Sequence, residues 1–258
     1  MFVALRPPRR AERSLVLRLA GTSKTWRRGS ARHAALKGGA TWLGGFLMQL
    51  DSHNSVAVLT FPSGNGYPRL SKSLLKELED LLDDVQGAGL FRGIVIAANS
   101  KSFATGAEVE EVMGQEGYSS ALFAGLGQSV CHRIAHYPLP FVAAMRGFCL
   151  GGGLDLALAC HARVATYDAA FGHPGASLGL ITGWGGTQRL PRWIGRSAAL
   201  QMLLTGERIP ASQALTMGLV DELTDSRDLI DAAVRRAERP RMTLLRVGTL
   251  KDIHTRAV

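Results

Sequence analysis

Three consecutive glycines, Gly151–Gly153, follow an apolar segment with strand character, Phe141–Met145, and lead into a segment with helical character. Glycines let a bound group approach the backbone closely, and the first N–H groups of a helix have no partner within it. Together with the positive end of the helix dipole, these groups favour an oxygen that carries negative charge. Asp155 adds an acid in the first helical turn. The segment is therefore either an anion-binding turn suited to enolate chemistry or an ordinary tight turn.

Strands and helices are expected to alternate along most of the chain. Strands are predicted at Val56–Phe61, Gly93–Ala98, Phe141–Met145 and Arg163–Thr166. Helices are predicted where leucines recur at helical spacing between Leu70 and Val85, at Ser119–His136, from Asp155 toward Cys160, and from Gly185 through Leu204. Such alternation predicts an α/β fold with a mostly parallel sheet flanked by helices.

The positive charge is concentrated at the N-terminus. The 258 residues are 46% hydrophobic, enough to bury a full core, and carry a formal charge of +9. Residues 1–47 hold ten of the 30 Lys and Arg residues but only one of the 21 acids, Glu12, so the remaining residues are neutral overall. We expect 1–47 to be a basic extension, disordered or not native. It fits an organellar transit peptide, an upstream misread start before Met48, or a basic tail that binds nucleic acid or membrane.

The cysteines and the apolar segments indicate a protein without disulfides or membrane spans. Cys131, Cys149 and Cys160 are odd in number and lack Cys-x-x-Cys spacing, so we expect buried free thiols in a reducing compartment. The most apolar region, 141–160, is interrupted by Arg146, the glycines and Asp155, and cannot span a bilayer. Dinucleotide-binding, P-loop, metal-ligand and nucleophile-elbow patterns are not found.

Two further motifs flank the glycine trio and give the chain a family resemblance. Ser102-Phe-Ala-Thr-Gly-Ala-Glu108 lies upstream, and a glycine-rich segment from Phe171 to Leu190 lies downstream. In this order and spacing, the three motifs closely resemble the crotonase family of enoyl-CoA hydratases and isomerases, over roughly Val56 to Glu222. The resemblance implies a spiral of repeated strand-strand-helix units, with C-terminal helices that cover the active site and form trimers. About 36 residues follow Glu222, which predicts a shortened C-terminal helical part.

This resemblance implies how the chain is divided into regions, its oligomeric state, its location in the cell and its partners. Residues 1–47 are the basic extension, 48–222 the crotonase-like core, and 223–258 a short C-terminal helical segment. A homotrimer or a dimer of trimers is implied, in the cytoplasm, or in mitochondria if 1–47 is a transit peptide. An acyl-CoA ester, as in fatty acid metabolism, is the implied small-molecule partner. Neither nucleic acid nor membrane is expected as a partner, and no metal or permanently bound cofactor is expected, since coenzyme A enters as part of the substrate.

The resemblance also assigns the catalytic groups. It gives two backbone N–H donors to a thioester carbonyl oxygen, those of Ala107 and Gly152, each worth about 10²–10³ in rate. In the hydratases two glutamates transfer protons; Asp155 matches the first, one methylene shorter, and Gly175 matches the second and has no acid. Losing one acid without a substitute would cost a factor of about 10²–10⁴ in hydration, whereas a double-bond shift needs one group only.

Several assignments stay open from the residues alone. Asp155 is also explained as an acid favoured by the helix dipole, which would lower its pKa and suit it to act as a base. His173 is either a substitute for the missing acid or a hydrogen-bonded structural histidine. Glu108 is expected to tie down its loop by an ion pair. A carboxylate from Glu110, Glu111 or Asp168 in the pocket would favour a hydratase.

Coenzyme A is expected along the loop before the first long helix and the 104–107 segment. The implied binding residues are Arg69, Ala104, Thr105, Gly106, Ala107, Gly151 and Gly152, with Lys72 as a further basic candidate and Trp184 in the acyl pocket. Three functions remain: an enoyl-CoA hydratase that uses Asp155 with a helper, an enoyl-CoA isomerase or other thioester enolate enzyme that uses Asp155 alone, and a non-catalytic acyl-CoA-binding paralogue.

Overall fold

The computed structural model is described for strands at 14–19, 22–27 and 40–43 and for residues 48–62, 64–98, 101–108, 111 and 117–239. Side chains are described from Met48 onward. None of the helices in these ranges combines the length and the apolar character needed to cross a membrane.

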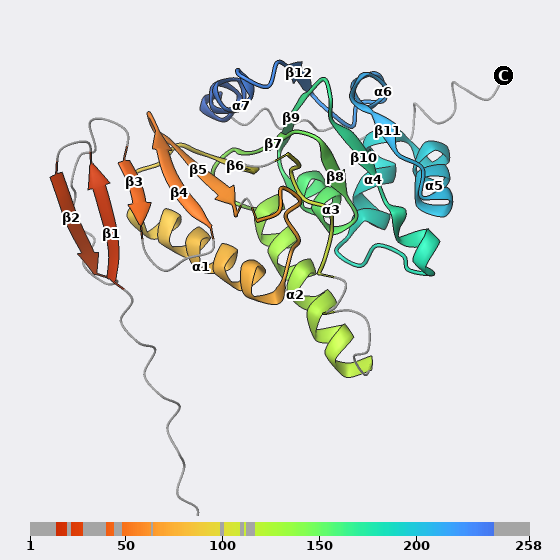
Figure 1. The fold of residues 1–258 in the computed structure, drawn as a ribbon, viewed down its shortest axis with the longest axis horizontal. Helices are drawn as coiled ribbons and strands as arrows, with labels where there is room; N and C mark the ends of the chain where they lie inside the picture. The colour runs from red at the N-terminus through yellow and green to blue at the C-terminus, as the bar shows by residue number, and fades with distance from the viewer. Residues whose placement is uncertain are drawn as a thin grey trace, which may run out of the picture.

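A nine-stranded sheet forms the centre of the molecule (Figure 1). In spatial order its strands are β12 (Glu222–Thr224), β9 (Ala162–Thr166), β7 (Phe141–Met145), β6 (Gly93–Ala98), β5 (Val56–Phe61), β4 (Gln49–His53), β3 (Ala40–Leu43), β1 (Ser14–Leu19) and β2 (Thr22–Arg27). The five strands from β12 to β5 are parallel, and the four from β4 to β2 extend the sheet antiparallel. Parallel strands that are buried on both faces have continuous apolar sequences, as β5, β6 and β7 do.

A smaller sheet of three strands stands beside the main one. β8 (Phe148–Leu150) pairs in parallel with β10 (Ala170–Gly172), which pairs antiparallel with β11 (Ile209–Pro210). β8 follows β7 after a turn at Gly147, so the chain leaves the main sheet here and enters the smaller one directly before the glycine trio.

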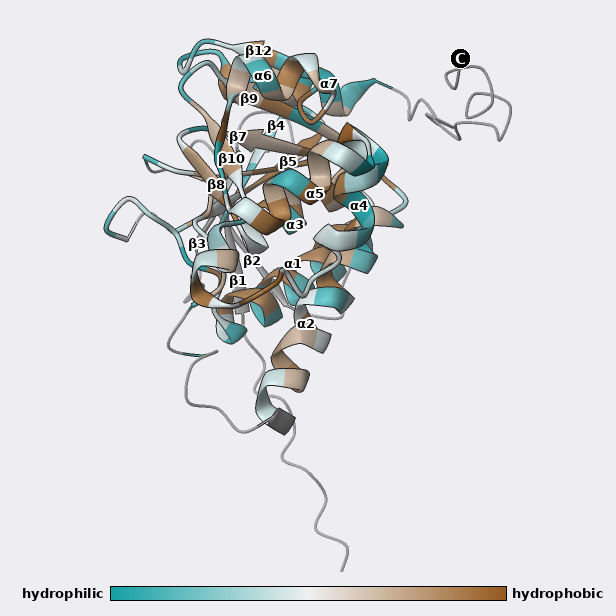
Figure 2. Cartoon of the chain, turned by 90° about the vertical axis from the view of Figure 1, so that its right-hand side faces the viewer, coloured by the Kyte–Doolittle hydropathy of each residue, from teal (hydrophilic) through white to brown (hydrophobic). Residues whose placement is uncertain are grey.

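Helices cover both faces of the main sheet. They are α1 (Lys72–Ala88), α2 (Gly117–Ala135), α3 (Gly152–Ala159), α4 (Gly186–Ile194), α5 (Arg196–Thr205), α6 (Ala211–Thr216) and α7 (Leu229–Glu238), with a 3-10 helix at Pro174–Leu178. Figure 1 shows α1 and α2 on one side of the sheet and α7 on the other. In Figure 2, hydrophobic residues predominate along β5 and β9, whereas hydrophilic residues are frequent on α1, α4 and α7.

The alternation of side chains along the strands divides the core into two layers. Ala57, Leu59 and Phe61 of β5 belong to the layer that includes α1, α2 and α3. Val56 and Val58 belong to the layer beneath α7. Because successive side chains of a strand point to opposite faces, one strand serves both layers.

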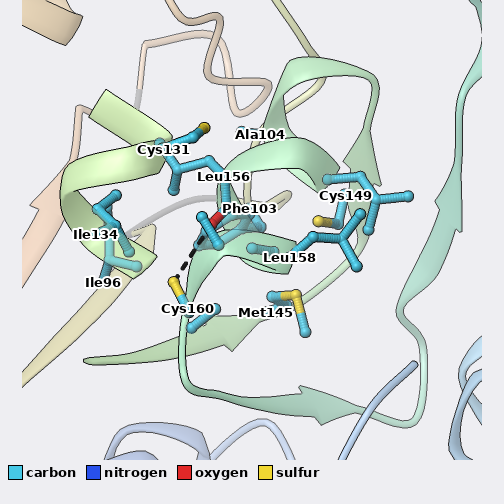
Figure 3. Close-up of a cluster of buried hydrophobic side chains, with 14 of the residues drawn as sticks. Ile96, Phe103, Ala104, Cys131, Ile134, Met145, Cys149, Leu156, Leu158 and Cys160 are labelled. Atoms are coloured by element: carbon cyan, nitrogen blue, oxygen red, sulfur yellow. Dashed lines mark hydrogen bonds between the residues drawn. The ribbon is translucent and has the colours of Figure 1, made fainter. Parts of the chain in front are cut away.

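The three cysteines lie in the larger layer, between α2, β8 and α3 (Figure 3). Each is a buried free thiol, as the sequence predicted. The Cys160 thiol donates to the Leu156 carbonyl oxygen at 3.4 Å, and burial raises the pKa of Cys160 to about 12. These thiols are therefore protonated, inert members of the core.

The predicted α/β fold is confirmed, with the parallel part of the sheet formed by the five strands from β12 to β5, and β5, β6 and β7 have the predicted bounds. Residues 1–47 include β1, β2 and β3, which pair antiparallel with one another and, through β3, with β4. Whether this segment is native stays a prediction.

Candidate active site

One pocket of about 630 Å³ collects most of the residues singled out in the sequence. Its lining is mostly apolar and comes from the 105–107 segment, the N-terminal part of α2, the glycine trio with α3, and the segment from 173 to 184. The predicted site residues in this lining are Thr105, Gly106, Ala107, Gly151, Gly152, Asp155 and Trp184. The three sequence motifs therefore meet at one cavity.

Close contacts around the glycine trio explain why side chains are excluded there. The Gly151 N–H donates to the Gly172 carbonyl oxygen at 2.9 Å, with Gly151 at a φ of 51°. A Cβ on Gly152 would lie 2.5 Å from the Trp184 ring, and one on Gly153 would lie 2.6 Å from the Ala104 carbonyl oxygen. Only glycine fits this approach. The next N–H after Gly151, that of Gly152, begins α3 at the pocket wall.

The second expected donor, the Ala107 N–H, is oriented by a bridge to Leu70. Leu70 donates to the Gly106 carbonyl oxygen at 2.9 Å, and the Glu108 N–H donates to the Leu70 carbonyl oxygen at 3.2 Å. Because neighbouring N–H groups of an extended chain point in opposite directions, the Ala107 N–H faces away from Leu70. A Cβ on Gly106 would lie 3.9 Å from the Gly152 nitrogen. Within the described ranges, neither the Ala107 nor the Gly152 N–H donates to another backbone group.

Asp155 is fully buried at the base of the pocket. Its Oδ2 accepts hydrogen bonds from the Thr182 hydroxyl and, at 3.1 Å, from the Trp184 N–H. Its Oδ1 makes no hydrogen bond within the described part of the chain. A Cβ on Gly186 would lie 2.1 Å from this Oδ1, so the glycine at 186 leaves room for the carboxylate.

The expectation that the helix dipole lowers the pKa of Asp155 is wrong. Burial raises the pKa of Asp155 from 3.8 to about 6, against the Thr182 and Trp184 hydrogen bonds, the charge of Arg189 and the nearby Gly186 N–H, which lower it. Desolvation of the carboxylate therefore outweighs every group that favours the charged form. At neutral pH the carboxylate is ionised and is a stronger base than an exposed aspartate.

His173 is not a hydrogen-bonded structural histidine. Its side chain is 3% exposed, lines the pocket, and places Nε2 3.7 Å from Asp155 Oδ1. Neither ring nitrogen has a hydrogen-bond partner among the residues that the structure describes. Burial lowers the pKa of His173 to about 4, so the ring is neutral at pH 7 and keeps one lone pair.

Asp155 is the only carboxylate among the described lining residues. Gly175, at the position of the second acid, lines the pocket without a side chain. Asp168 is exposed outside the pocket, and Glu111 accepts a hydrogen bond from the Lys72 N–H at 2.7 Å. Glu110 lies outside the described residues. The proposed carboxylate helpers Asp168 and Glu111 therefore do not supply the second group.

Arg69 and Ala104 do not line the pocket. The Arg69 guanidinium pairs with Glu108 at 2.8 Å, which confirms the predicted ion pair of Glu108. Ala104 is fully buried, and its backbone pairs with β8. The basic side chain among the described lining residues is instead Arg208, whose guanidinium lies 5.1 Å from the centre of the Phe148 ring.

Two lining residues contribute in ways that their sequence positions did not reveal. Thr182, within a glycine-rich stretch, holds the Asp155 carboxylate. Trp184 lies edge-on to Phe123, with ring centres 5.5 Å apart, and closes the pocket over the glycine trio. Lys72 places its ammonium 5.5 Å from the centre of the Phe123 ring, outside the lining.

Comparisons with known proteins identify the family of the chain. The chain is 43% identical over 168 residues to a "Probable enoyl-CoA hydratase" of Bacillus subtilis, a match that spans 64% of this chain and 64% of the relative's length. The crystal structure of an enoyl-CoA hydratase from Bacillus anthracis matches with a TM-score of 0.71 and 30% identity, over 75% of this chain and 76% of that one. An enoyl-CoA hydratase from Thermoplasma volcanium matches with a TM-score of 0.71 and 26% identity, over 76% and 79%. The profile of the family described as enoyl-CoA hydratase/isomerase covers residues 51–257, and the chain belongs to that family.

Proposed function

We propose that the protein is an enoyl-CoA hydratase-like lyase, which adds water across the 2,3 double bond of an acyl-CoA thioester. The observation that carries this proposal is the convergence of three groups on one pocket. The N–H groups of Ala107 and Gly152 have no other backbone partner among the described residues, and the Asp155 carboxylate stands at the base of the same cavity. Two donors aimed at one oxygen beside a buried base suit the formation of a thioester enolate.

The reaction begins with the thioester carbonyl oxygen between the two N–H groups. Attack of water on C3 moves the double-bond electrons onto that oxygen, where the donors stabilise the enolate by about 10²–10³ in rate each. Asp155 takes the proton that the water loses and delivers a proton to C2. Its pKa of about 6 serves both steps, because the carboxylate is ionised at neutral pH yet is readily protonated.

The apolar wall is suited to an acyl chain. Leu178, Leu180, Ile181 and Phe123 line the pocket, and Leu178 and Ile181 are 63% and 67% exposed at its rim. Coenzyme A enters as part of the substrate rather than as a resident cofactor, with Arg208 in the pocket lining as a cation for its charged part. Further exposed leucines on α5, Leu200 and Leu204, support association into a trimer or a dimer of trimers.

An enoyl-CoA isomerase is the second candidate, and one observation favours it. Gly175 contributes no carboxylate to the pocket. Moving a double bond by one position needs one group that removes a proton and returns it to a neighbouring carbon. Asp155 alone is sufficient for that reaction.

Turnover of two substrates distinguishes the candidates. We expect the wild-type chain to hydrate crotonyl-CoA to the 3-hydroxyacyl thioester, and Asp155→Asn to lose this activity while it still binds the thioester. Migration of the double bond of 3-hexenoyl-CoA without any hydration would establish the isomerase instead. Tight binding of both esters with neither reaction would refute both activities and favour a non-catalytic acyl-CoA-binding protein.

A further inference from the structure

Two buried polar atoms that make no hydrogen bond to any described residue face each other at the base of the pocket. They are Nε2 of His173 and Oδ1 of Asp155, 3.7 Å apart. The His173 side chain is 3% exposed and the Asp155 side chain is fully buried. Burying a polar group without a partner is unfavourable, and such pairs are uncommon in folded proteins. Both residues line the cavity, but the two atoms are themselves enclosed by protein, so a water reaches both only when a side chain at the cavity wall shifts.

The backbone fixes His173 relative to the expected oxyanion donors. His173 follows the last residue of β10, Gly172, whose carbonyl oxygen accepts the Gly151 N–H at 2.9 Å. A Cβ on Gly172 would lie 3.0 Å from the Glu207 carbonyl oxygen, so this strand end is tightly enclosed. Pro174 follows His173 and opens the 3-10 helix. One hydrogen bond thus links the glycine trio to the backbone that presents the imidazole.

The charged and titratable groups around this pair leave it with one negative charge at neutral pH. Arg189, on α4, acts on Asp155 through its charge and donates to the Trp184 carbonyl oxygen at 3.0 Å. Arg208 lines the same cavity, and the nearby thiols of Cys131, Cys149 and Cys160 are neutral because burial raises their pKa values. His173 is itself uncharged at pH 7, since burial lowers its pKa to about 4.

We propose that His173 Nε2 and Asp155 Oδ1 together hold the attacking water, so that His173 supplies the second water-holding group where position 175 has no acid. This inference rests on the proposed hydratase activity. A water oxygen about 2.8 Å from each atom fits a pair 3.7 Å apart and subtends an angle of about 80° between them. Both atoms accept a hydrogen bond from the water, His173 through the lone pair of the tautomer protonated on Nδ1. The water lone pair is then free to attack C3.

One acid and one neutral histidine are sufficient to account for both hydrogens of the water. The O–H bond that points to Asp155 breaks as the C–O bond to C3 forms, and its proton moves to Oδ1. The double-bond electrons move to the thioester oxygen, and the enolate then takes the proton from Oδ1 at C2. The second hydrogen of the water stays on oxygen, hydrogen-bonded to His173 until it becomes the product hydroxyl. His173 therefore binds and orients water but gains and loses no proton.

The proposal predicts that hydration depends on His173 and isomerisation does not. We expect His173→Leu to lower kcat for crotonyl-CoA hydration by about 10²-fold or more, because one of two water-holding groups is lost. Migration of the double bond of 3-hexenoyl-CoA uses no water and should stay within about threefold of wild type. His173→Gln, which can place an amide oxygen near the position of Nε2, should retain more hydration than His173→Leu. Thioester affinity, measured for each variant, should stay near the wild-type value.

His161 provides a matched control, because it is a histidine with both ring nitrogens engaged. Its Nδ1 accepts from the Phe141 N–H at 2.9 Å, and its Nε2 lies 3.2 Å from the Ala135 carbonyl oxygen. His161→Gln should lower thermal stability and leave the ratio of the two activities unchanged. A second test restores the missing acid: Gly175→Glu in the His173→Leu chain should recover hydration, since a Cβ at 175 requires a small shift only, at 3.0 Å from the Leu180 carbonyl oxygen.

Each of three outcomes would overturn the role proposed for His173. Wild-type hydration with no loss in His173→Leu overturns the role of His173 and leaves the proposed hydratase intact. An equal fall of both reactions in a folded His173→Leu chain also overturns it, because the histidine would then act on the shared enolate step. If the wild-type chain isomerises 3-hexenoyl-CoA but hydrates neither ester, the proposed hydratase and the water-holding role both fall.

Discussion

Replacing Asp155 by asparagine is expected to stabilise the fold at neutral pH while removing the proposed catalytic base. The raised pKa of Asp155, about 6 against 3.8, means that the ionised carboxylate disfavours the folded state. Below pH 3.8 the carboxyl is protonated in both states and costs no stability. As pH rises, the unfolded chain releases its proton before the folded chain does, so stability falls until about pH 6 and then levels off. The loss by pH 7 is about 3 kcal/mol.

The variant should lack this pH-dependent loss. The side-chain carbonyl oxygen of the introduced asparagine can accept from Thr182 and the Trp184 N–H as Oδ2 does, and its amide can face His173 Nε2 in place of Oδ1. The stability difference between the variant and wild type should grow from about 1.5 kcal/mol at pH 5 to about 3 kcal/mol at pH 7, and stay constant to pH 8. For a chain of this size the gain at pH 7 corresponds to about 6–12 °C in Tm.

Urea unfolding of both chains at pH 5, 6, 7 and 8 measures this difference, with unchanged m-values showing that the same surface unfolds. Asp168→Asn is the matched control, since Asp168 is exposed and the same charge is removed. Its stability should follow wild type at every pH. A stability difference between Asp155→Asn and wild type that is independent of pH, or that narrows between pH 5 and 7, would refute the raised pKa of the buried carboxylate on which the proposed mechanism depends.

Three further predictions concern the pKa of Asp155, the space at Gly186 and the hydrogen bonds of Arg163. If ionised Asp155 is the base, kcat/KM for hydration should fall about tenfold per pH unit below about pH 6; a profile flat down to pH 5 would exclude it. Gly186→Ala should lower hydration by at least 10²-fold with little change in CD, because its Cβ would lie 2.1 Å from Asp155 Oδ1; near wild-type turnover would show that the carboxylate need not stay in place. Arg163→Ala should lower the free energy of unfolding by about 3 kcal/mol. Fully buried Arg163 donates to the Leu219 and Cys160 carbonyl oxygens and to Asp221, and the variant loses all of these hydrogen bonds. A loss under 1 kcal/mol in urea unfolding would refute this.

The sequence predicted the elements whose side chains repeat with a clear period. The leucines of α1 all turn to one buried face, and β5, β6 and β7 are long enough to stand out as apolar runs. β8 and β10 have three residues each, too few to show any alternation. They form because β8 and β10 pair with each other, a contact between segments more than 20 residues apart.

Most residues that line the pocket were predictable from the sequence, whereas their electrostatics were not. The helix dipole was expected to lower the pKa of Asp155, but a helix terminus contributes only about 0.3–1 kcal/mol at the surface. Complete burial of the carboxylate depends on Thr182, Trp184 and Gly186, which lie about 30 residues further along the chain. Likewise, nothing near His173 in the sequence shows that its ring nitrogens have no partners in the described structure, because that depends on how the fold packs around it.

Rates of crotonyl-CoA hydration by wild type and Asp155→Asn, on the preparations used for the unfolding measurements, test the central claim most directly. We expect the variant to be the more stable protein at pH 7 and its hydration rate to be at least 10³-fold lower, because the one carboxylate among the described lining residues is gone. A folded Asp155→Asn chain that hydrates within tenfold of wild type would contradict the account, since the proton would then be carried by a group other than Asp155.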